Sequence, residues 1–301
     1  MIKLKTFGSF TVGNGLTSVQ EGAWRSEKLE KLFVYLAMNR NRGVCIEDIS
    51  EAIWQVEEET DNPVGALKNL AYRLRKALRD ASFGEECIVS VRGGLYKWND
   101  DVEVTIDVEE FDRYINEAEM AFCRSKETAI ESYEKAIALY NGDFLSRLTD
   151  THWFMTLNAF YHSRYVNTVK ALAKLYIDTG CYEKLEQLCT RAIVYERSDE
   201  QIYSYLIVAR MRTKKVQMAF DTYETAKAIM DKDLGVRKTV MLNKVYEELL
   251  SVTKGASSYN IDEVKDDISE ESMNGVFMCG YPVFKDCLLY TSPSPRDRTR
   301  S

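Results

Sequence analysis

The stretch DNPVGALKNLAYRLRKALRD, residues 61–80, determines how the first part of the chain folds. Its apolar side chains recur at three- and four-residue spacing, which is typical of a helix with one buried face. They are Leu67, Leu70, Ala71, Leu74, Ala77 and Leu78. Asn62 and Pro63 are suited to begin the helix, because Asn caps free backbone N–H groups and Pro lacks the N–H that would stay unpaired. The pattern therefore predicts an amphipathic helix.

The opposite face of this predicted helix is cationic, and no carboxylate lies between Asp61 and Asp80 to neutralise it. Its polar and charged positions are Lys68, Asn69, Tyr72, Arg73, Arg75, Lys76 and Arg79. Positive charge of this density attracts a phosphate backbone. An ordinary solvated helix face would look the same in isolation, so the flanking sequence has to decide between the two interpretations.

The positive charge is local. The whole chain has a formal net charge of −7, whereas residues 62–97 carry seven Lys or Arg against three acids, a balance of +4 that leaves −11 for the remainder. A protein that is acidic as a whole is not a general polyanion binder. Any nucleic-acid surface is therefore expected on this segment alone.

Short strands and helices surround the cationic stretch. Residues 2–12 alternate apolar and polar side chains, which predicts a small hairpin or meander, and helical spacing recurs over 26–39 and 46–54. Residues 87–98, CIVSVRGGLYKW, read as two strands joined at a paired-glycine turn. The predicted order is a sheet, three helices and a hairpin.

This order, with RLRKAL in the third helix and VRGGLYKW in the hairpin, resembles the winged-helix DNA-binding domain of the OmpR/PhoB type. The resemblance implies an α+β winged helix at residues 1–100 whose partner is double-stranded DNA. In that family the third helix enters the major groove and the hairpin is the wing beside it.

The resemblance also implies roles for single residues. The N-terminal part of a recognition helix usually contacts base edges, whereas cations further along contact phosphates. We expect DNA base readout from Lys68, Asn69, Tyr72 and Arg73. We expect DNA phosphate contacts from Arg75, Lys76, Arg79 and, on the wing, Arg92. A solvated cation is the alternative at each position.

The connection before the third helix, residues 55–62, is acidic and suggests a second surface. In OmpR/PhoB-type domains this loop can approach RNA polymerase, and an acidic loop beside bound DNA suits a basic partner. The residues expected to make this contact are Glu57, Glu58, Glu59 and Asp61. A solvated turn is the alternative.

From residue 107 to about 250 the spacing is helical throughout. The predicted helices are 108–123, 125–140, 150–179, 181–195, 199–213, 215–231 and 239–251. An offset of 34 residues, the tetratricopeptide period, places Leu185 on Ala219, Cys189 on Tyr223, Ala192 on Ala226 and Gly180 on Lys214. The spacing predicts an all-α array of helix pairs.

Three segments in this region, TIDVEEFDRY at 105, ALYNGDFL at 138 and MDKDLGVRKTVMLNKVYEELL at 230, resemble the bacterial transcriptional activator domain. That domain follows a winged helix in SARP-type regulators. The resemblance implies a tetratricopeptide-like activator domain at residues 105–251, which provides protein–protein contacts or a homodimer interface. Trp153, Phe154, Phe160, Tyr161 and Tyr165 are expected to fill its core rather than a contact surface.

The sequence offers little for catalysis. His152 and His162 are expected to be surface or packing residues, since neither accompanies a nucleophile motif, and no phosphate-binding GxxxxGK[ST] motif occurs. The seven cysteines form no CxxC pair, which favours reduced thiols in a cytoplasmic protein over a zinc site or a disulfide framework. No apolar run reaches the roughly 18 residues of a membrane span. We therefore expect no enzyme activity, cofactor, metal or membrane contact.

The C-terminal residues suggest a different origin. Residues 252–275 are polar and acidic, which predicts a linker, and 276–286 begin an apolar segment that is interrupted. Residues 287–301, CLLYTSPSPRDRTRS, resemble the translation of a sequencing adapter, and we expect them to be an artefact. A disordered natural tail is the alternative.

Taken together, the patterns predict a sequence-specific DNA-binding transcriptional regulator, an activator that recruits RNA polymerase. One alternative is a helical-repeat scaffold whose winged helix binds protein. Another is a signalling protein whose sensory or enzymatic domain followed residue 286. The salt dependence of binding separates the first alternative, because phosphate contacts respond steeply to salt.

Overall fold

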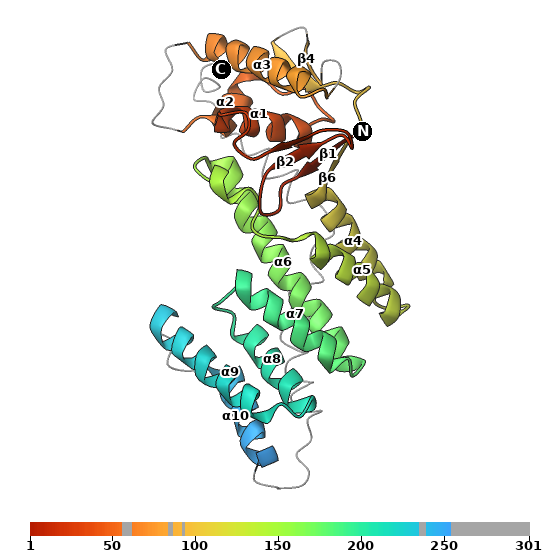
Figure 1. The fold of residues 1–301 in the computed structure, drawn as a ribbon, viewed down its shortest axis with the longest axis vertical. Coiled ribbons are helices and arrows are strands. Elements are labelled where there is room, and N and C mark those ends of the chain that lie inside the picture. Colours follow the sequence, from red (N-terminus) through yellow and green to blue (C-terminus); the bar gives the residue numbers. More distant parts are fainter. Residues whose placement is uncertain (56–61, 84–86, 92–93, 235–238, 254–301) are drawn as a thin grey trace, which may run out of the picture.

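The computed structural model describes residues 1–55, 62–83, 87–91, 94–234 and 239–253. A small α+β unit at one end of the chain is followed by a stack of helices that extends away from it (Figure 1). The predicted fold class, a winged helix followed by an all-α tetratricopeptide-like array, is confirmed.

The N-terminal sheet has four short strands in the order β3-β2-β1-β6. They are β1 (Ile2–Lys5), β2 (Thr11–Gly13), β3 (Ser18–Gln20) and β6 (Val104–Ile106). The predicted hairpin in residues 2–12 is present as β1 and β2, whereas β3 and β6 were not predicted. Strand β6 pairs in parallel with β1, with Leu4 opposite Ile106, although about a hundred residues separate them in the chain.

Three helices and a hairpin complete the winged helix, in the predicted order. They are α1 (Glu27–Met38), α2 (Ile46–Ile53), α3 (Pro63–Asp80), β4 (Ile88–Val91) and β5 (Leu95–Trp98). The three helices contact one another, and α1 also contacts β5. Phe33 of α1 packs edge-on against Trp98 of β5, with ring centroids 5.4 Å apart, so the hairpin is tied to the helical core.

The remaining helices contact one another in sequence order, as expected of a repeat array. They are α4 (Asp107–Ala121), α5 (Lys126–Leu139), α6 (His152–Asp178), α7 (Tyr182–Tyr195), α8 (Glu200–Arg212), α9 (Val216–Ile229) and α10 (Val240–Thr253). Two short helices, η1 (Ser146–Leu148) and η2 (Met230–Leu234), lie between them. Helix α8 is buried along almost its whole length.

The 34-residue repeat predicted from the sequence is visible in the backbone. Gly180 and Lys214 occupy equivalent turns, and both have positive φ, +71° and +62°. The three further pairs that the offset aligns, 185 with 219, 189 with 223 and 192 with 226, are buried in α7 and α9. Equivalent turns and equivalent buried positions make the α6–α7 and α8–α9 pairs two copies of one helical repeat.

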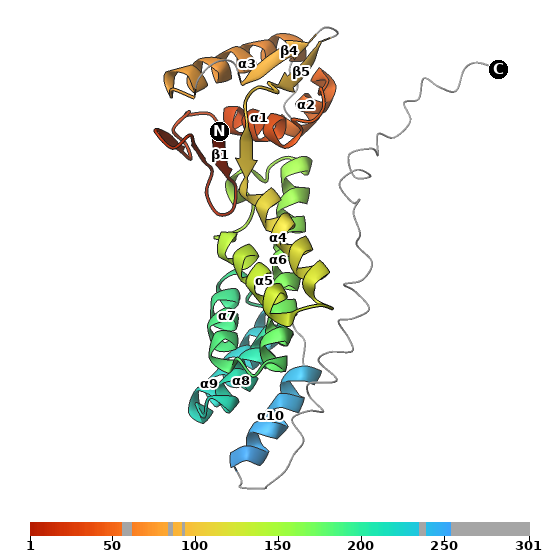
Figure 2. The same cartoon turned by 90° about the vertical axis from the view of Figure 1, so that its right-hand side faces the viewer.

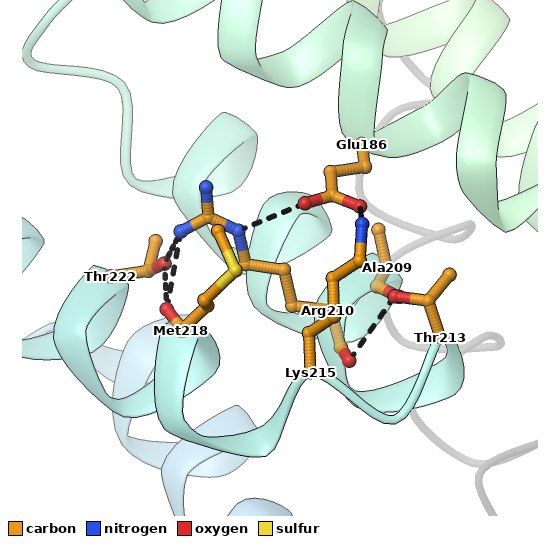
Figure 3. A network of polar contacts seen from close by, with 7 residues as sticks. All are labelled: Glu186, Ala209, Arg210, Thr213, Lys215, Met218 and Thr222. Atoms are coloured by element: carbon orange, nitrogen blue, oxygen red, sulfur yellow. Dashed lines mark hydrogen bonds and ion pairs between the residues drawn. The ribbon is translucent and has the colours of Figure 1, made fainter.

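A polar network holds the second repeat to the first (Figure 3). Glu186 of α7 accepts hydrogen bonds from Arg210 of α8 at 3.4 Å and from Lys215 at 2.6 Å. Arg210 also donates to the carbonyl of Met218 at 3.1 Å and to the hydroxyl of Thr222, both on α9. Because the side chains of Glu186 and Arg210 are 13% and 16% exposed, this network joins three helices in a largely desolvated position.

The aromatic residues at the start of α6 lie in the core, as predicted. Phe154, Tyr161 and Tyr165 are buried, and Trp153 and Phe160 are partly buried against them. One of these residues also packs against the winged helix, since the ring centroids of Trp153 and Tyr35 of α1 are 5.0 Å apart. The two parts of the chain therefore share one apolar interior.

Asp107, the first residue of α4, ties the sheet to the helical array. Its carboxylate is 8% exposed and accepts hydrogen bonds from the backbone N–H of Thr6 at 2.8 and 2.9 Å, from the Thr6 hydroxyl at 2.6 Å and from the N–H of Phe7 at 3.0 Å. Its own helix contributes the N–H of Val108 at 3.0 Å. This buried carboxylate therefore satisfies the polar groups at the end of β1.

His162 is an ion-pair residue within the helical array. Its Nδ1 lies 2.8 Å from Asp143, and its Nε2 lies 3.1 Å from Glu196. The hydrogen bond with Asp143, with a further contribution from Glu196, raises the pKa of His162 from 6.5 to about 9, although burial alone would lower it. His152, in contrast, is exposed.

The pH dependence of stability should report on this cluster. A pKa raised in the folded state stabilises the protein fully below the unfolded value and loses that effect as the pH rises through the folded value. Replacing His162 by Gln is therefore expected to cost on the order of 2–3 kcal/mol of unfolding free energy at pH 6, and much less at pH 9.5. Urea unfolding at both pH values measures this, with His152→Gln as the matched control. An equal loss at both pH values would contradict the assignment.

Candidate nucleic-acid interface

Helix α3 presents one apolar and one polar face. The residues buried against the other helices are Leu67, Leu70, Ala71, Leu74 and Leu78. Asn62 caps the helix, since its side chain accepts from the N–H of Gly65 at 2.9 Å, and Pro63 occupies the first turn. The helix therefore begins as predicted, and its buried stripe fixes which side chains face outward.

The outward face is cationic along its whole length. Its exposed residues are Lys68, Asn69, Tyr72, Arg73, Lys76 and Arg79. Tyr72 is 66% exposed, although it is a large aromatic side chain. Within the residues that the structure describes, no carboxylate lies within ion-pair distance of any of the four cations. These four cations share one exposed face of the helix.

Helix α3 lies at one end of the molecule. Helix α3 packs on α1 and α2 and lies at the end of the molecule opposite α9 and α10 (Figures 1 and 2). Helices α7 to α10 extend away from it in both views. The outer face of α3 therefore lies far from the C-terminal helices of the repeat array.

Arg75 connects α3 to the wing strand. It is only partly exposed, and its Nε donates to the carbonyl of Ile88 on β4 at 3.0 Å. Its guanidinium thus lies between α3 and the wing strand. This bond ties the hairpin to the helix, and the phosphate contact expected of Arg75 stays a prediction.

Five predicted site residues lie outside the described residues: Arg92 of the wing, and Glu57, Glu58, Glu59 and Asp61 of the connection before α3. The adjacent helix α2 is described and is itself acidic. Glu47 and Glu51 are exposed on it, and Asp48 is partly exposed. The acidic character that the sequence placed before α3 therefore extends onto α2.

The end of α3 is held by the N-terminal sheet, which the sequence did not reveal. Asn14 donates from its side chain to the carbonyl of Ser82 at 2.9 Å, and the Thr17 hydroxyl donates to the carbonyl of Ala81 at 2.9 Å. These bonds hold the two residues that directly follow the helix. The β2–β3 turn therefore positions α3 from its C-terminal end, while Asn62 caps the other.

The described residues contain no group of three or more His, Cys, Asp or Glu side chains placed to hold a metal ion. No helix among them combines the length and the apolar character needed to cross a membrane. The exposed face of α3 itself carries cations, an amide and a phenol. These are groups that bind phosphates, hydrogen-bond to base edges and stack on sugars or bases.

Comparison with known proteins covers both parts of the chain. Residues 106–250 match the family described as the bacterial transcriptional activator domain. Over 238 residues the chain is 23% identical to the transcriptional regulator RedD of Streptomyces coelicolor. This match covers 78% of this chain and 67% of RedD.

A solved structure resembles the fold. The structure of Mycobacterium tuberculosis EmbR in complex with a low-affinity phosphopeptide superposes with a TM-score of 0.66 at 18% identity. The match covers 91% of this chain and 69% of EmbR. It therefore spans the winged helix and the helical array in the same order along the chain.

Proposed function

We propose that this chain, whose residues 106–250 match the bacterial transcriptional activator domain, is a transcriptional regulator of the SARP type and binds duplex DNA through α3. The observation that carries the proposal is the cationic outer face of α3, which lacks carboxylate partners among the described residues and lies at the free end of the molecule. In this proposal α3 occupies the major groove, and the β4–β5 hairpin lies beside the neighbouring phosphates.

We assign base readout to the N-terminal half of the exposed face, at Lys68, Asn69, Tyr72 and Arg73. Lys and Arg can donate to guanine O6 and N7, and Asn can pair with adenine N6 and N7. Lys76 and Arg79, further along the helix, are assigned to phosphates, together with Arg92 of the wing. In this proposal residues 1–100 bind the DNA, and residues 105–251 make the protein–protein contacts. The protein acts in the cytoplasm, where the DNA lies.

Single alanine substitutions should separate these roles. Arg73→Ala is expected to cost about 1–3 kcal/mol of binding free energy and to relax the sequence preference at one base pair. Lys76→Ala should weaken binding to all duplexes alike and lower the salt slope by roughly one. Gel shifts on a duplex selected from a randomised library, and on its single-base variants, measure both effects.

Arg124→Ala provides the matched control, because Arg124 is an exposed arginine in the turn between α4 and α5, away from α3. It should bind as the unmodified protein does. If Arg73→Ala and Lys76→Ala also retain the affinity and preference of the unmodified chain, α3 is not the reading element.

We further propose that the protein activates transcription by contacting RNA polymerase through the acidic connection before α3. Glu57, Glu58 and Glu59, which follow the acidic helix α2 in the sequence, would attract a basic polymerase surface. Replacing the three glutamates by Ala should leave DNA binding intact and reduce transcript yield several-fold in a reconstituted reaction, since a charged rim mainly sets encounter. An unchanged yield at equal promoter occupancy would contradict the polymerase contact.

A further inference from the structure

The turn that leads from η1 into α6 lies directly against the winged helix. Asp150 accepts hydrogen bonds from the ammonium of Lys31 on α1 and from the side-chain amide of Gln55 at 2.9 Å. The hydroxyl of its neighbour Thr151 donates to the carbonyl of Ala52 on α2 at 2.8 Å. Two consecutive residues of the activator domain thus contact both α1 and the end of α2.

Lys31 makes this contact unusual. Its side chain is 2% exposed, and Asp150 is its ion-pair partner within the described part of the chain. A buried ammonium without a partner is strongly unfavourable, so Asp150 completes the interior of the winged helix. Burial alone would raise the pKa of the Asp150 carboxyl, but the bonds from Lys31 and Gln55 hold it below its usual value, which keeps the carboxylate charged.

The contacted atoms lie just before the recognition helix. Ala52 is in the last turn of α2, and Gln55 lies in the connection between α2 and Asn62, which caps α3. Helix α1, which carries Lys31, packs against the buried face of α3. Asp150 and Thr151 therefore hold the two helices on which α3 rests.

We infer that Asp150 and Thr151 are positioning residues for DNA recognition, through which the activator domain fixes the orientation of α3 without contacting DNA. The expected effect on DNA affinity rests on the proposed DNA-binding function. Its structural content, the immobilisation of α3 from the activator domain, can be measured without DNA.

Three full-length variants test the inference. Thr151→Val keeps the side-chain shape and removes only the bond to Ala52. Asp150→Ala leaves Lys31 buried without its partner, and it should lower the unfolding midpoint by roughly 10 °C. The double variant Lys31→Met with Asp150→Ala removes the orphaned charge and should recover most of that midpoint, so its DNA affinity can be compared at nearly normal stability.

Two readouts are expected to move together in Thr151→Val and in the double variant. Amide hydrogen exchange over residues 62–80 should become faster than in the unmodified protein. Affinity for a selected duplex should fall roughly five- to tenfold, the effect of one lost hydrogen bond, at an unchanged salt slope. The unchanged slope separates positioning from the loss of a phosphate contact.

Unchanged exchange over 62–80 in both folded variants would overturn the inference, as would duplex affinity equal to that of the unmodified chain. Failure of the unmodified protein to bind any duplex is a different result, because it would contradict the proposed function while leaving the exchange comparison decisive for the inference. Asp178, an acidic residue at the far end of α6, provides the control: Asp178→Ala should change neither the exchange of 62–80 nor the affinity.

Discussion

Replacing Arg73 and Lys76 together by Glu is expected to abolish sequence-specific binding of duplex DNA, with a loss of roughly a thousandfold or more. Each substitution removes a contact to the duplex and adds a negative charge that faces its phosphates. Both side chains are exposed, and neither has an ion-pair partner in the described part of the chain, so the reversal should leave the fold intact. Anisotropy titration of a labelled selected duplex measures the loss.

The control for this variant is a reversal of equal charge elsewhere. Arg124 and Arg212 are exposed on the helical array, and their double replacement by Glu changes the net charge by the same amount. It should lower affinity only through the weak long-range field, which salt screens. If the two double variants lose affinity equally, the cations of α3 act only through the long-range electrostatic field of the protein. That result would contradict a direct contact between α3 and DNA.

Replacing Asp107 by Ala is expected to destabilise the protein by about 3–5 kcal/mol, enough to unfold a marginally stable chain. The buried carboxylate accepts from the backbone N–H groups of Thr6 and Phe7 and from the Thr6 hydroxyl. Within the described residues these three donors have no other acceptor. The substitution leaves these donors unpaired where β1, β6 and α4 meet. Urea unfolding followed by far-UV circular dichroism measures the loss.

Asp101→Ala is the matched control, because Asp101 is exposed in the turn just before β6. It should change the unfolding free energy by no more than about 0.5 kcal/mol. A loss below about 1 kcal/mol for Asp107→Ala would show that water replaces the carboxylate, and that the sheet does not depend on the helical array.

Local periodicity predicted the helices well, because the buried residues of each helix recur every three or four positions in the sequence. The four leucines and Ala71 face the core, while Ala77 is only partly buried. The polar positions between them face outward, except Arg75, which is partly buried against β4. The 34-residue offset likewise found turns that share a positive φ at Gly180 and Lys214.

Long-range pairing could not be read in the same way. Strand β6 has only three residues, and its partner β1 lies about a hundred residues away, so no local pattern marks it as part of the N-terminal sheet. The role of Arg75 depends on where the hairpin places the carbonyl of Ile88, which the helical spacing does not contain. Lys31 is a further case, since a lysine on a helix is expected in solvent unless a distant acid, here Asp150, pairs with it.

The salt dependence of duplex binding tests most directly whether the cationic face of α3 lies against DNA. For the full chain on a selected duplex, the logarithm of the association constant should fall with the logarithm of the salt concentration at a slope of about −3 or steeper. The slope should become shallower by roughly one for each of Lys76→Ala and Arg79→Ala. A nearly flat dependence, or a slope that neither substitution changes, would contradict the assignment of α3 to DNA.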